Sequence, residues 1–137
     1  MAGFPSTIKL EVVSPRRLLL SVEAGYVSLP GSEGYLGVLP GHLPLLTTLG
    51  TGVVSYTQGT HKHSLSLSGG FAEVLPDRVI IMAETVELPE EIDVKRAREA
   101  RERAEKRLGS RDQIDVERAM AALLRATNRL HLADQRK

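Results

Sequence analysis

The segment from Gly31 to Gly52, which reads GSEGYLGVLPGHLPLLTTLGTG, restricts the possible folds of this chain more than any other segment. It places 6 glycines and 2 prolines among apolar residues. Glycine permits backbone angles closed to other residues, and proline fixes its own φ and lacks an N–H donor. We therefore predict short strands joined by tight turns, with a shaped loop at residues 40–44 that the neighbouring leucines hold down. On these residues alone, a structural corner of a β-sandwich is as good an interpretation as a binding loop.

The sequence from residue 6 to residue 86 has β-strand patterns almost throughout. Alternating or β-rich runs predict strands at residues 8–12, 18–23, 52–56, 64–68, 71–75 and 79–83. Turn signals separate these runs, including Gly69-Gly70 and Pro76-Asp77. Many short strands at close spacing predict an antiparallel sandwich or a flattened barrel.

The composition changes at about residue 89, where the sequence becomes rich in Ala, Arg, Glu and Lys. Asp93 is a candidate N-cap for a first helix that continues to Leu108, and Gly109 is expected to stop it. A second helix is predicted from about Asp115 to Leu132, after a turn at residues 110–114. Two helices joined by a short turn form an αα-hairpin.

These patterns predict an α+β fold in two domains. An N-terminal antiparallel β-sandwich occupies residues 1–88, and a C-terminal antiparallel two-helix hairpin occupies residues 89–137. Residues 1–92 carry 5 Lys/Arg and 9 Asp/Glu, a net charge of −4, whereas residues 93–137 carry 13 and 8, a net charge of +5. This asymmetry indicates two modules with different partners. The chain contains no cysteine, which excludes disulfides and thiolate metal sites, and no apolar run approaches a membrane span.

Alanines at helical spacing predict how the hairpin packs. Each helix carries one narrow stripe of three alanines: Ala97, Ala100 and Ala104 on the first, and Ala119, Ala122 and Ala126 on the second. We expect the two stripes to face each other, because small residues let helices approach closely. Burial of each alanine yields about 1 kcal/mol or less, so the hairpin should hold together weakly unless it is docked. A second stripe is available to pack on the sandwich: Met120, Leu123, Thr127 and Leu130.

Arginines lie beside both alanine stripes. Helical geometry places Arg96 and Arg103 of the first helix on the same side of the antiparallel pair as three arginines of the second: Arg118, Arg125 and Arg129. Converging guanidiniums repel one another unless they bind an anion, and phosphate suits their planar fork. A solvated charged face is the alternative, and the spacing alone favours it slightly.

Other candidate sites are weaker. The chain lacks the GxxxxGK[ST] phosphate loop, so ATP hydrolysis by this chain alone is not expected. His61 and His63 alternate on one strand, but no third metal ligand lies near them in the sequence. His42 follows a Pro-Gly turn without a nucleophile beside it. We therefore predict no catalytic residue and no metal site.

Three ordered motifs resemble the epsilon subunit of bacterial F-type ATP synthase. They are GSEGYLGVLPGH at residues 31–42, followed by PLLT; GGFAEV at residues 69–74; and IDVKRA at residues 92–97, which is similar to the I/L-D-x-x-R-A signature of nucleotide-binding members. The resemblance implies a non-catalytic rotor subunit of a proton-translocating synthase. Its sandwich would join the gamma subunit and seat the c-ring, and its mobile hairpin would extend along gamma and inhibit ATP hydrolysis.

The resemblance also implies ATP as a regulatory ligand of the folded hairpin, with no required cofactor. The matching positions are Glu87, Asp93, Arg96, Arg103, Arg125 and Arg129. Glu33 and His42 match the region that lies towards the c-ring and gamma, and the alpha and beta subunits would be partners of the extended hairpin. The implied location is the cytoplasmic face of the bacterial inner membrane, through the complex and without direct insertion.

The alternative is a basic helical-hairpin module on a β scaffold that binds nucleic acid. The 13 basic residues of the hairpin permit this reading, but the 8 acidic residues among them and the 4% aromatic content argue against it.

Overall fold

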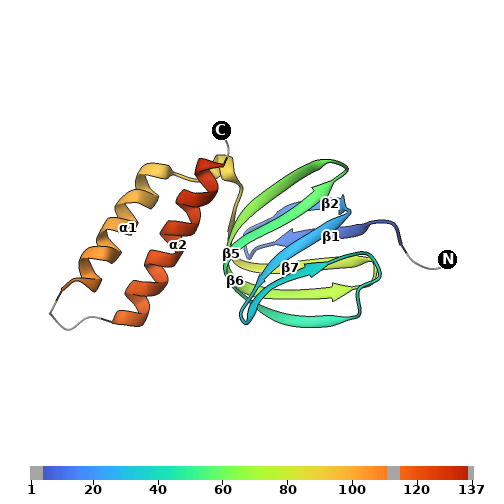
Figure 1. Ribbon diagram of the computed structural model, residues 1–137, viewed down its shortest axis with the longest axis horizontal. Helices are drawn as coiled ribbons and strands as arrows, with labels where there is room; N and C mark the ends of the chain where they lie inside the picture. The colour runs from blue at the N-terminus through green and yellow to red at the C-terminus, as the bar shows by residue number, and fades with distance from the viewer. Residues whose placement is uncertain (1–4, 111–114, 136–137) are drawn as a thin grey trace. The chain divides into compact units, whose positions relative to one another are not determined.

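A computed structural model describes residues 5–110 and 115–135 (Figure 1). The chain divides into two compact units, Met1–Val86 and Glu87–Lys137. The first unit is built from strands and the second from helices.

Seven strands form the first unit. They are β1 (Ile8–Val13), β2 (Leu18–Ala24), β3 (Tyr26–Gly31), β4 (Gly34–Val38), β5 (Leu45–Gln58), β6 (His61–Leu75) and β7 (Arg78–Glu87). They are hydrogen-bonded in the order β2-β1-β7-β6-β5-β3-β4. The long strands β5 and β6 curve so that the sheet folds over on itself (Figure 1). As a result, β2 at one edge reaches β5, where Gln58 Nε2 donates to the Glu23 carbonyl at 3.3 Å.

This arrangement confirms the predicted β-sandwich. The strand pairs β1–β2, β3–β4, β3–β5 and β5–β6 are antiparallel, as predicted. The pair β1–β7 is parallel, however, with Leu10 opposite Val79. β1 and β7 are far apart in the sequence. Their parallel pairing is possible because, unlike neighbouring strands, they are not joined by a short hairpin turn.

Alternation along the strands builds the core. In β1, for example, Ile8, Leu10 and Val12 are completely buried, whereas the side chains between them point to the other face. The same period of two buries Leu65 and Leu67 in β6 and Val79 and Ile81 in β7. Each such side chain contributes about 1.5–3 kcal/mol relative to an exposed one.

The prediction that Gly69-Gly70 ends one strand and begins another is wrong. The two runs belong to the single strand β6, which stays paired with β5 on both sides of the glycines, from Thr51–Ser68 to Leu49–Gly70. Gly69 and Gly70 have φ values of 76° and 129°, in a region that favours glycine. The glycines therefore bend the strand without interrupting it.

The leucines around the Pro-Gly-His loop do not hold it down as predicted. Leu39 and Leu43 are 61% and 79% exposed. The loop is fixed by its backbone instead, because Gly41 N–H, at a φ of 87°, donates to the Pro76 carbonyl at 2.7 Å. Turn chemistry, rather than apolar burial, shapes this loop.

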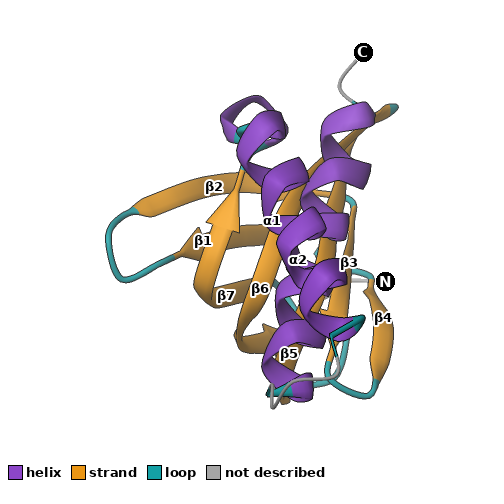
Figure 2. Ribbon diagram, turned by 90° about the vertical axis from the view of Figure 1, so that its left-hand side faces the viewer, coloured by secondary structure: helices purple, strands orange, loops and turns teal. Residues whose placement is uncertain are grey.

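The second unit contains η1 (Pro89–Glu91), α1 (Val94–Leu108) and α2 (Val116–Asp134), which pack against each other (Figure 2). The predicted N-cap of the first helix is present, and Asp115 caps the second helix in the same way: the Oδ1 atoms of Asp93 and Asp115 accept from the N–H groups of Arg96 and Arg118, each at 3.0 Å. The first helix ends at Gly109 as predicted, although this glycine has a right-handed φ of −82°. The predicted turn falls largely on residues 111–114, outside the described residues.

The alanine stripes lie in the interior of the helical unit. Ala97 and Ala104 are the buried residues of α1, and Ala119 and Ala126 are buried at the same seven-residue spacing on α2. Ala100 and Ala122 are half-buried. Since the two helices contact each other over their length, the stripes form a close interface with little apolar area.

Candidate anion-binding site

The helical unit contains a cavity of about 320 Å³. It is lined by Glu87, Glu91, Asp93, Arg96, Ala97, Ala100, Arg103 and Arg129. Ligand pockets in proteins span about 300–1,000 Å³, so this cavity has the size of a small ligand site.

Local structure explains why the cavity forms at this place. Arg96, Ala100 and Arg103 lie at i, i+4 and i+7 on one face of α1, so two long side chains flank a small one. Ala97 adds a second small residue beside them, which leaves open space. Asp93 caps the start of this helix and lines the cavity, so the positive end of the helix dipole lies close to the cavity.

The three carboxylates of the cavity are engaged within the protein. Glu87 forms an ion pair with Arg129, and both side chains are partly exposed. Asp93 Oδ1 accepts from the Arg96 N–H, and Glu91 Oε2 accepts from the Leu88 N–H at 2.9 Å. These contacts fix the positions of the three carboxylates and compensate part of their negative charge.

The two arginines of α1 that line the cavity, Arg96 and Arg103, form no ion pair with a residue of 5–110 or 115–135, unlike Arg129. A guanidinium is always charged and carries five N–H donors. The cavity therefore presents to a ligand two guanidiniums without an ion pair among the described residues, and a third that is paired with Glu87.

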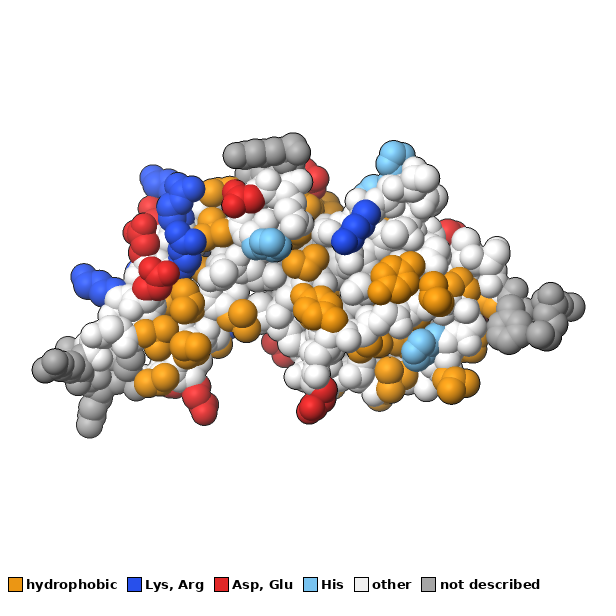
Figure 3. Space-filling model, in the orientation of Figure 1, with side chains coloured by type: hydrophobic (Ala, Val, Ile, Leu, Met, Phe, Trp, Pro, Cys, Tyr) orange, Lys and Arg blue, Asp and Glu red, His pale blue; other side chains and the backbone are white. Residues whose placement is uncertain are grey.

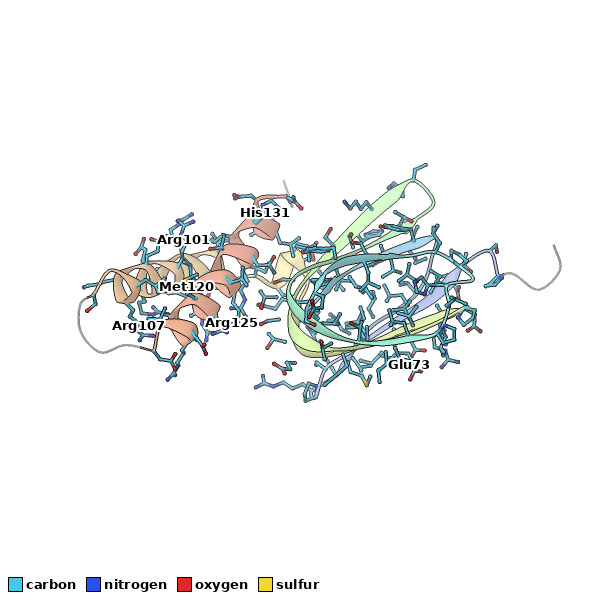
Figure 4. All side chains as sticks on the ribbon, turned by 60° about the horizontal axis from the view of Figure 1, so that its bottom comes forward. Glu73, Arg101, Arg107, Met120, Arg125 and His131 are labelled. Atoms are coloured by element: carbon cyan, nitrogen blue, oxygen red, sulfur yellow. The ribbon has the colours of Figure 1, made fainter. Side chains whose placement is uncertain are left out.

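The structure brings together five of the six residues that the resemblance assigns to ATP: Glu87, Asp93, Arg96, Arg103 and Arg129. The sixth, Arg125, is half-buried and does not line the cavity. Arg125 of α2 and Arg107 of α1 lie on the same side of the hairpin, opposite Arg101 (Figure 4). Arg118 is exposed. The role of these residues in ATP binding stays a prediction.

Glu91 lines the cavity but was not among the predicted site residues. In the sequence its position after Pro89 indicates only an acidic residue suited to the start of a helix. Its reach back to the Leu88 N–H gives the short η1 segment a cap, and this contact turns the carboxylate towards the cavity.

Glu33 and His42 lie in two separate turns of the first unit. Glu33 is exposed at the two-residue turn between β3 and β4. His42 is half-buried, and its Nδ1 donates to the Leu43 carbonyl at 2.6 Å, which leaves Nε2 as the free ring nitrogen of the neutral form. Their predicted contact with the c-ring and gamma stays a prediction.

His63, one of the two histidines of β6, has a structural contact. His63 stacks on Tyr56 of β5 with ring centroids 5.0 Å apart, and burial raises the pKa of Tyr56 above its ordinary value of 10. Within residues 5–110 and 115–135, no three His, Cys, Asp or Glu side chains gather as metal ligands would. In the same part of the chain, no helix is long and apolar enough to cross a membrane.

The surface of the helical unit carries charges of both signs. Lys and Arg side chains gather over the helices in Figure 3, and acidic side chains lie between them. Phosphate backbones of nucleic acids require a largely uniform positive surface. The mixed surface favours a small anion held in the cavity over a nucleic acid lying on the helices.

Comparisons with known proteins agree with this architecture. Residues 7–89 match the family model of the β-sandwich domain of the ATP synthase delta/epsilon chain, and residues 90–134 match that of its long alpha-helix domain. The ATP synthase epsilon chain of Koribacter versatilis is 53% identical over 102 residues, which cover 74% of this chain and 72% of that one. The epsilon chain of Moorella thermoacetica is 51% identical over 107 residues, which cover 77% and 80%.

A solved structure is similar over nearly the whole chain. It belongs to the Euglena gracilis mitochondrial ATP synthase, described as OSCP/F1/c-ring in rotational state 1. The matching chain is 26% identical with a TM-score of 0.82, and the alignment covers 93% of this chain and 81% of that one.

A β-sandwich followed by a helical hairpin, together with the two family matches, therefore defines a two-domain subunit of the ATP synthase delta/epsilon class. This chain belongs to the ATP synthase delta/epsilon chain family. Within the family it groups with the bacterial epsilon chains, which are central-stalk subunits of F-type ATP synthase.

Proposed function

We propose that this chain is a non-catalytic regulatory rotor subunit whose hairpin binds ATP in the arginine-lined cavity. The observation that carries the proposal is the convergence of Arg96, Arg103 and Arg129 on one cavity of ligand size. In this reading ATP is a regulatory ligand and is not hydrolysed by the chain.

The chemistry of the cavity suits a polyphosphate. Arg96 and Arg103 each offer a planar fork that donates two bonds to one phosphate group. The start of α1 adds backbone N–H groups and the positive end of the helix dipole. Glu87 holds Arg129 in position before the ligand arrives, and the phosphate then shares this arginine with the carboxylate.

Binding of ATP can regulate the hairpin because the hairpin is weakly held. The buried contacts between α1 and α2 are mainly alanines, each worth about 1 kcal/mol or less. A ligand that binds only the folded hairpin stabilises it by RT ln(1 + [L]/Kd), about 2.7 kcal/mol at 100 times Kd. ATP therefore keeps the hairpin folded, and its loss frees the helices to extend along the gamma subunit towards alpha and beta and to inhibit hydrolysis.

The sandwich carries the rotor contacts in this proposal. Glu33, at the tip of the β3–β4 turn, and His42, in the Pro-Gly-His loop, contact the c-ring and the gamma subunit. Both turns are fixed by backbone hydrogen bonds, since Ser32 N–H donates to Thr48 O at 3.0 Å and Gly41 N–H to Pro76 O. Rigid turns transmit torque better than flexible ones. The membrane association of the subunit is peripheral and runs through the complex.

The regulatory part is tested by ATP hydrolysis in a reconstituted F1 complex. Complexes that contain the wild-type chain should be inhibited at low ATP and released at high ATP. With Arg96→Ala, inhibition should persist to higher ATP concentrations, because the folded hairpin loses its ligand. Equal ATP dependence for the two complexes would rule the regulatory proposal out.

A further inference from the structure

The arginines that line the cavity belong to a longer row, which the ATP proposal does not use in full. At about 100° per residue, three arginines of each helix fall within about 40° of one another, beside the alanine stripe of that helix. We call these six residues the arginine face: Arg96, Arg103 and Arg107 of α1, and Arg118, Arg125 and Arg129 of α2. Figure 4 shows Arg107 and Arg125 on one side of the hairpin and Arg101 on the other.

The arginine face begins and ends with a pair of arginines. The two helices are antiparallel, so positions that stand level can be found by counting residues (Figure 1). Arg96 and Arg129 line the same cavity. Arg107 lies 11 residues after Arg96, and Arg118 lies 11 residues before Arg129, so this second pair also stands about level. The two pairs are about 16 Å apart along the helices, at about 1.5 Å per residue.

Between the two pairs, each level holds one arginine and one alanine. By the same count Arg125 of α2 is level with Ala100 of α1, and Arg103 of α1 is level with Ala122 of α2. Both alanines are half-buried. The long side chains therefore alternate between the helices, each with a small side chain opposite, which leaves room for a linear ligand along the row.

The charges at the far end of the row are not compensated by described residues. Arg107, Arg118 and Arg125 form no ion pair with a residue of 5–110 or 115–135. Arg107 and Arg118 are also exposed, so a ligand can reach them. Among the acidic residues within the two helices, Glu99 comes nearest in direction, and it is still about 40° from Arg103.

Helix stability does not account for the arginine face. Arg103 and Arg107 are like charges four residues apart, as are Arg125 and Arg129, and such pairs destabilise a helix. Arg118 lies in the first turn of α2, where the helix dipole disfavours a cation. An anion that lies along the whole row would compensate these unfavourable charges.

The row has a direction. The three carboxylates that line the cavity all precede α1, whereas the arginine face continues from the cavity to the end of α1 and the start of α2. Carboxylates repel phosphate and accept hydrogen bonds from hydroxyl and amino groups. A phosphate chain that enters the cavity is therefore directed away from the carboxylates, towards Arg107 and Arg118.

We propose that the arginine face binds a linear phosphate chain longer than that of ATP, as found in inorganic polyphosphate and in nucleoside tetraphosphates. The chain starts in the cavity and continues along the arginine face to Arg107 and Arg118, where each planar fork donates two bonds to a phosphate group. The inference rests on the proposed function for the phosphates in the cavity, and it adds the extension beyond them.

The test is calorimetric titration of the full chain with two matched pairs of ligands. One pair is inorganic triphosphate and a longer inorganic polyphosphate of defined length, and the other is ATP and adenosine tetraphosphate. In at least one pair, the wild type should bind the longer member about tenfold or more tightly, because added contacts are charge-assisted hydrogen bonds. A gain in the inorganic pair alone assigns the site to inorganic polyphosphate, and a gain in the nucleotide pair alone assigns it to nucleoside polyphosphates.

The double variant Arg107→Ala/Arg118→Ala should lose this gain, so that the longer and the shorter ligand bind about equally. Lys95→Ala/Arg98→Ala is the matched control, since it removes two exposed positive charges of α1 that lie outside the arginine face. The control should keep the gain. Circular dichroism checks that each variant is folded. Should the first variant not fold, Arg107→Gln/Arg118→Gln tests the same pair with longer side chains.

Three results would overturn the proposal: equal affinity of the wild type for both members of both pairs, a gain that survives without Arg107 and Arg118, or a gain that the control also loses. The two proposals fail separately. Binding of ATP without a gain from chain length would leave the proposed function standing and remove this inference. A gain in the inorganic pair without any binding of ATP would do the reverse.

Discussion

Glu87, the last residue of β7, forms an ion pair with Arg129 of α2, 42 positions later in the chain. The pair joins the entry of the helical unit to its second helix, at the rim of the cavity. We therefore expect it to contribute both to the stability of the folded hairpin and to the position of an arginine that lines the cavity.

Replacement of Glu87 by Gln tests the contribution of the ion pair to the stability of the folded hairpin. The change keeps the side-chain shape and removes the charge, and we expect amides of α2 near Arg129 to exchange faster. The free energy of local unfolding of α2 should fall by only about 0.5–1 kcal/mol, because both partners of the ion pair are partly exposed to solvent. Native-state hydrogen exchange measures it. Glu90→Gln is the control, since Glu90 is exposed on η1. Unchanged protection of α2 in Glu87→Gln would show that the pair does not hold the hairpin.

The two N-caps allow the structural and ligand roles of Asp93 to be separated. Asp93 and Asp115 cap α1 and α2 with the same geometry, but only Asp93 lines the cavity. Each change to Ala should cost about 0.5–2 kcal/mol in helix stability. Only Asp93→Ala should also weaken ATP binding at a temperature where both variants are folded. Equal ATP affinities for the two variants, measured by calorimetry, would limit Asp93 to a capping role.

Gly70 should tolerate no side chain. Its φ of 129° is strained for other residues, and an added Cβ would lie 2.2 Å from the Met82 carbonyl. We expect Gly70→Ala to lower the free energy of unfolding by more than about 2 kcal/mol, through strain and overpacking. In Gly50→Ala the added methyl meets no atom closer than 4.0 Å, so thermal unfolding should show a much smaller change. Similar melting temperatures for the two variants would contradict the account of the β6 bend.

Truncation after Glu91 should leave a folded sandwich that still binds gamma. The compact unit that ends at Val86 contains the complete apolar core of the strands. The truncated chain should bind no ATP and should release inhibition of hydrolysis in the assembled complex. Circular dichroism tests whether the truncated chain is folded, and calorimetry tests whether it binds ATP. The hydrolysis rate of the assembled complex tests the release of inhibition. An unfolded product would show that the helices are needed for the core.

The proposed contacts of Glu33 and His42 with the rotor have a separate test. The double change to Ala should leave the sandwich folded, because neither side chain contributes to its core. It should weaken assembly with the membrane ring and reduce the coupling of proton flow to ATP synthesis. Wild-type coupling in membranes that carry the double variant would remove these residues from the interface.

Features governed by local chemistry were predictable from the sequence. Asp93 and Asp115 act as N-caps because a short carboxylate at that position satisfies backbone N–H groups that the helix leaves open. The arginine convergence follows from helical period alone, and Arg96, Arg103 and Arg129 do line one cavity. Arg125, which the same period groups with them, does not line the cavity.

Features that depend on tertiary structure were not predictable in the same way. Gly69-Gly70 has the pattern of a turn, but pairing with β5 on both sides keeps β6 continuous. The exposed leucines of the Pro-Gly-His loop have the pattern of core residues, yet a hydrogen bond to Pro76 fixes the loop without them. The parallel pairing of β1 with β7 joins segments about 70 residues apart, and no local pattern specifies it.

Calorimetric titration of the isolated full chain with ATP at millimolar concentration tests the central claim most directly. We predict saturable heat, a raised melting temperature and amide shifts that centre on residues 87–103 and Arg129. Arg96→Ala and Arg129→Ala should each weaken binding by about 1.5–3 kcal/mol, the value of a hydrogen bond to a charged group. Lysine at either position should restore binding only in part. Arg98→Ala, on an exposed part of α1 outside the cavity, should bind as the wild type does. Absence of both heat and a melting-temperature shift in the wild type would contradict the account.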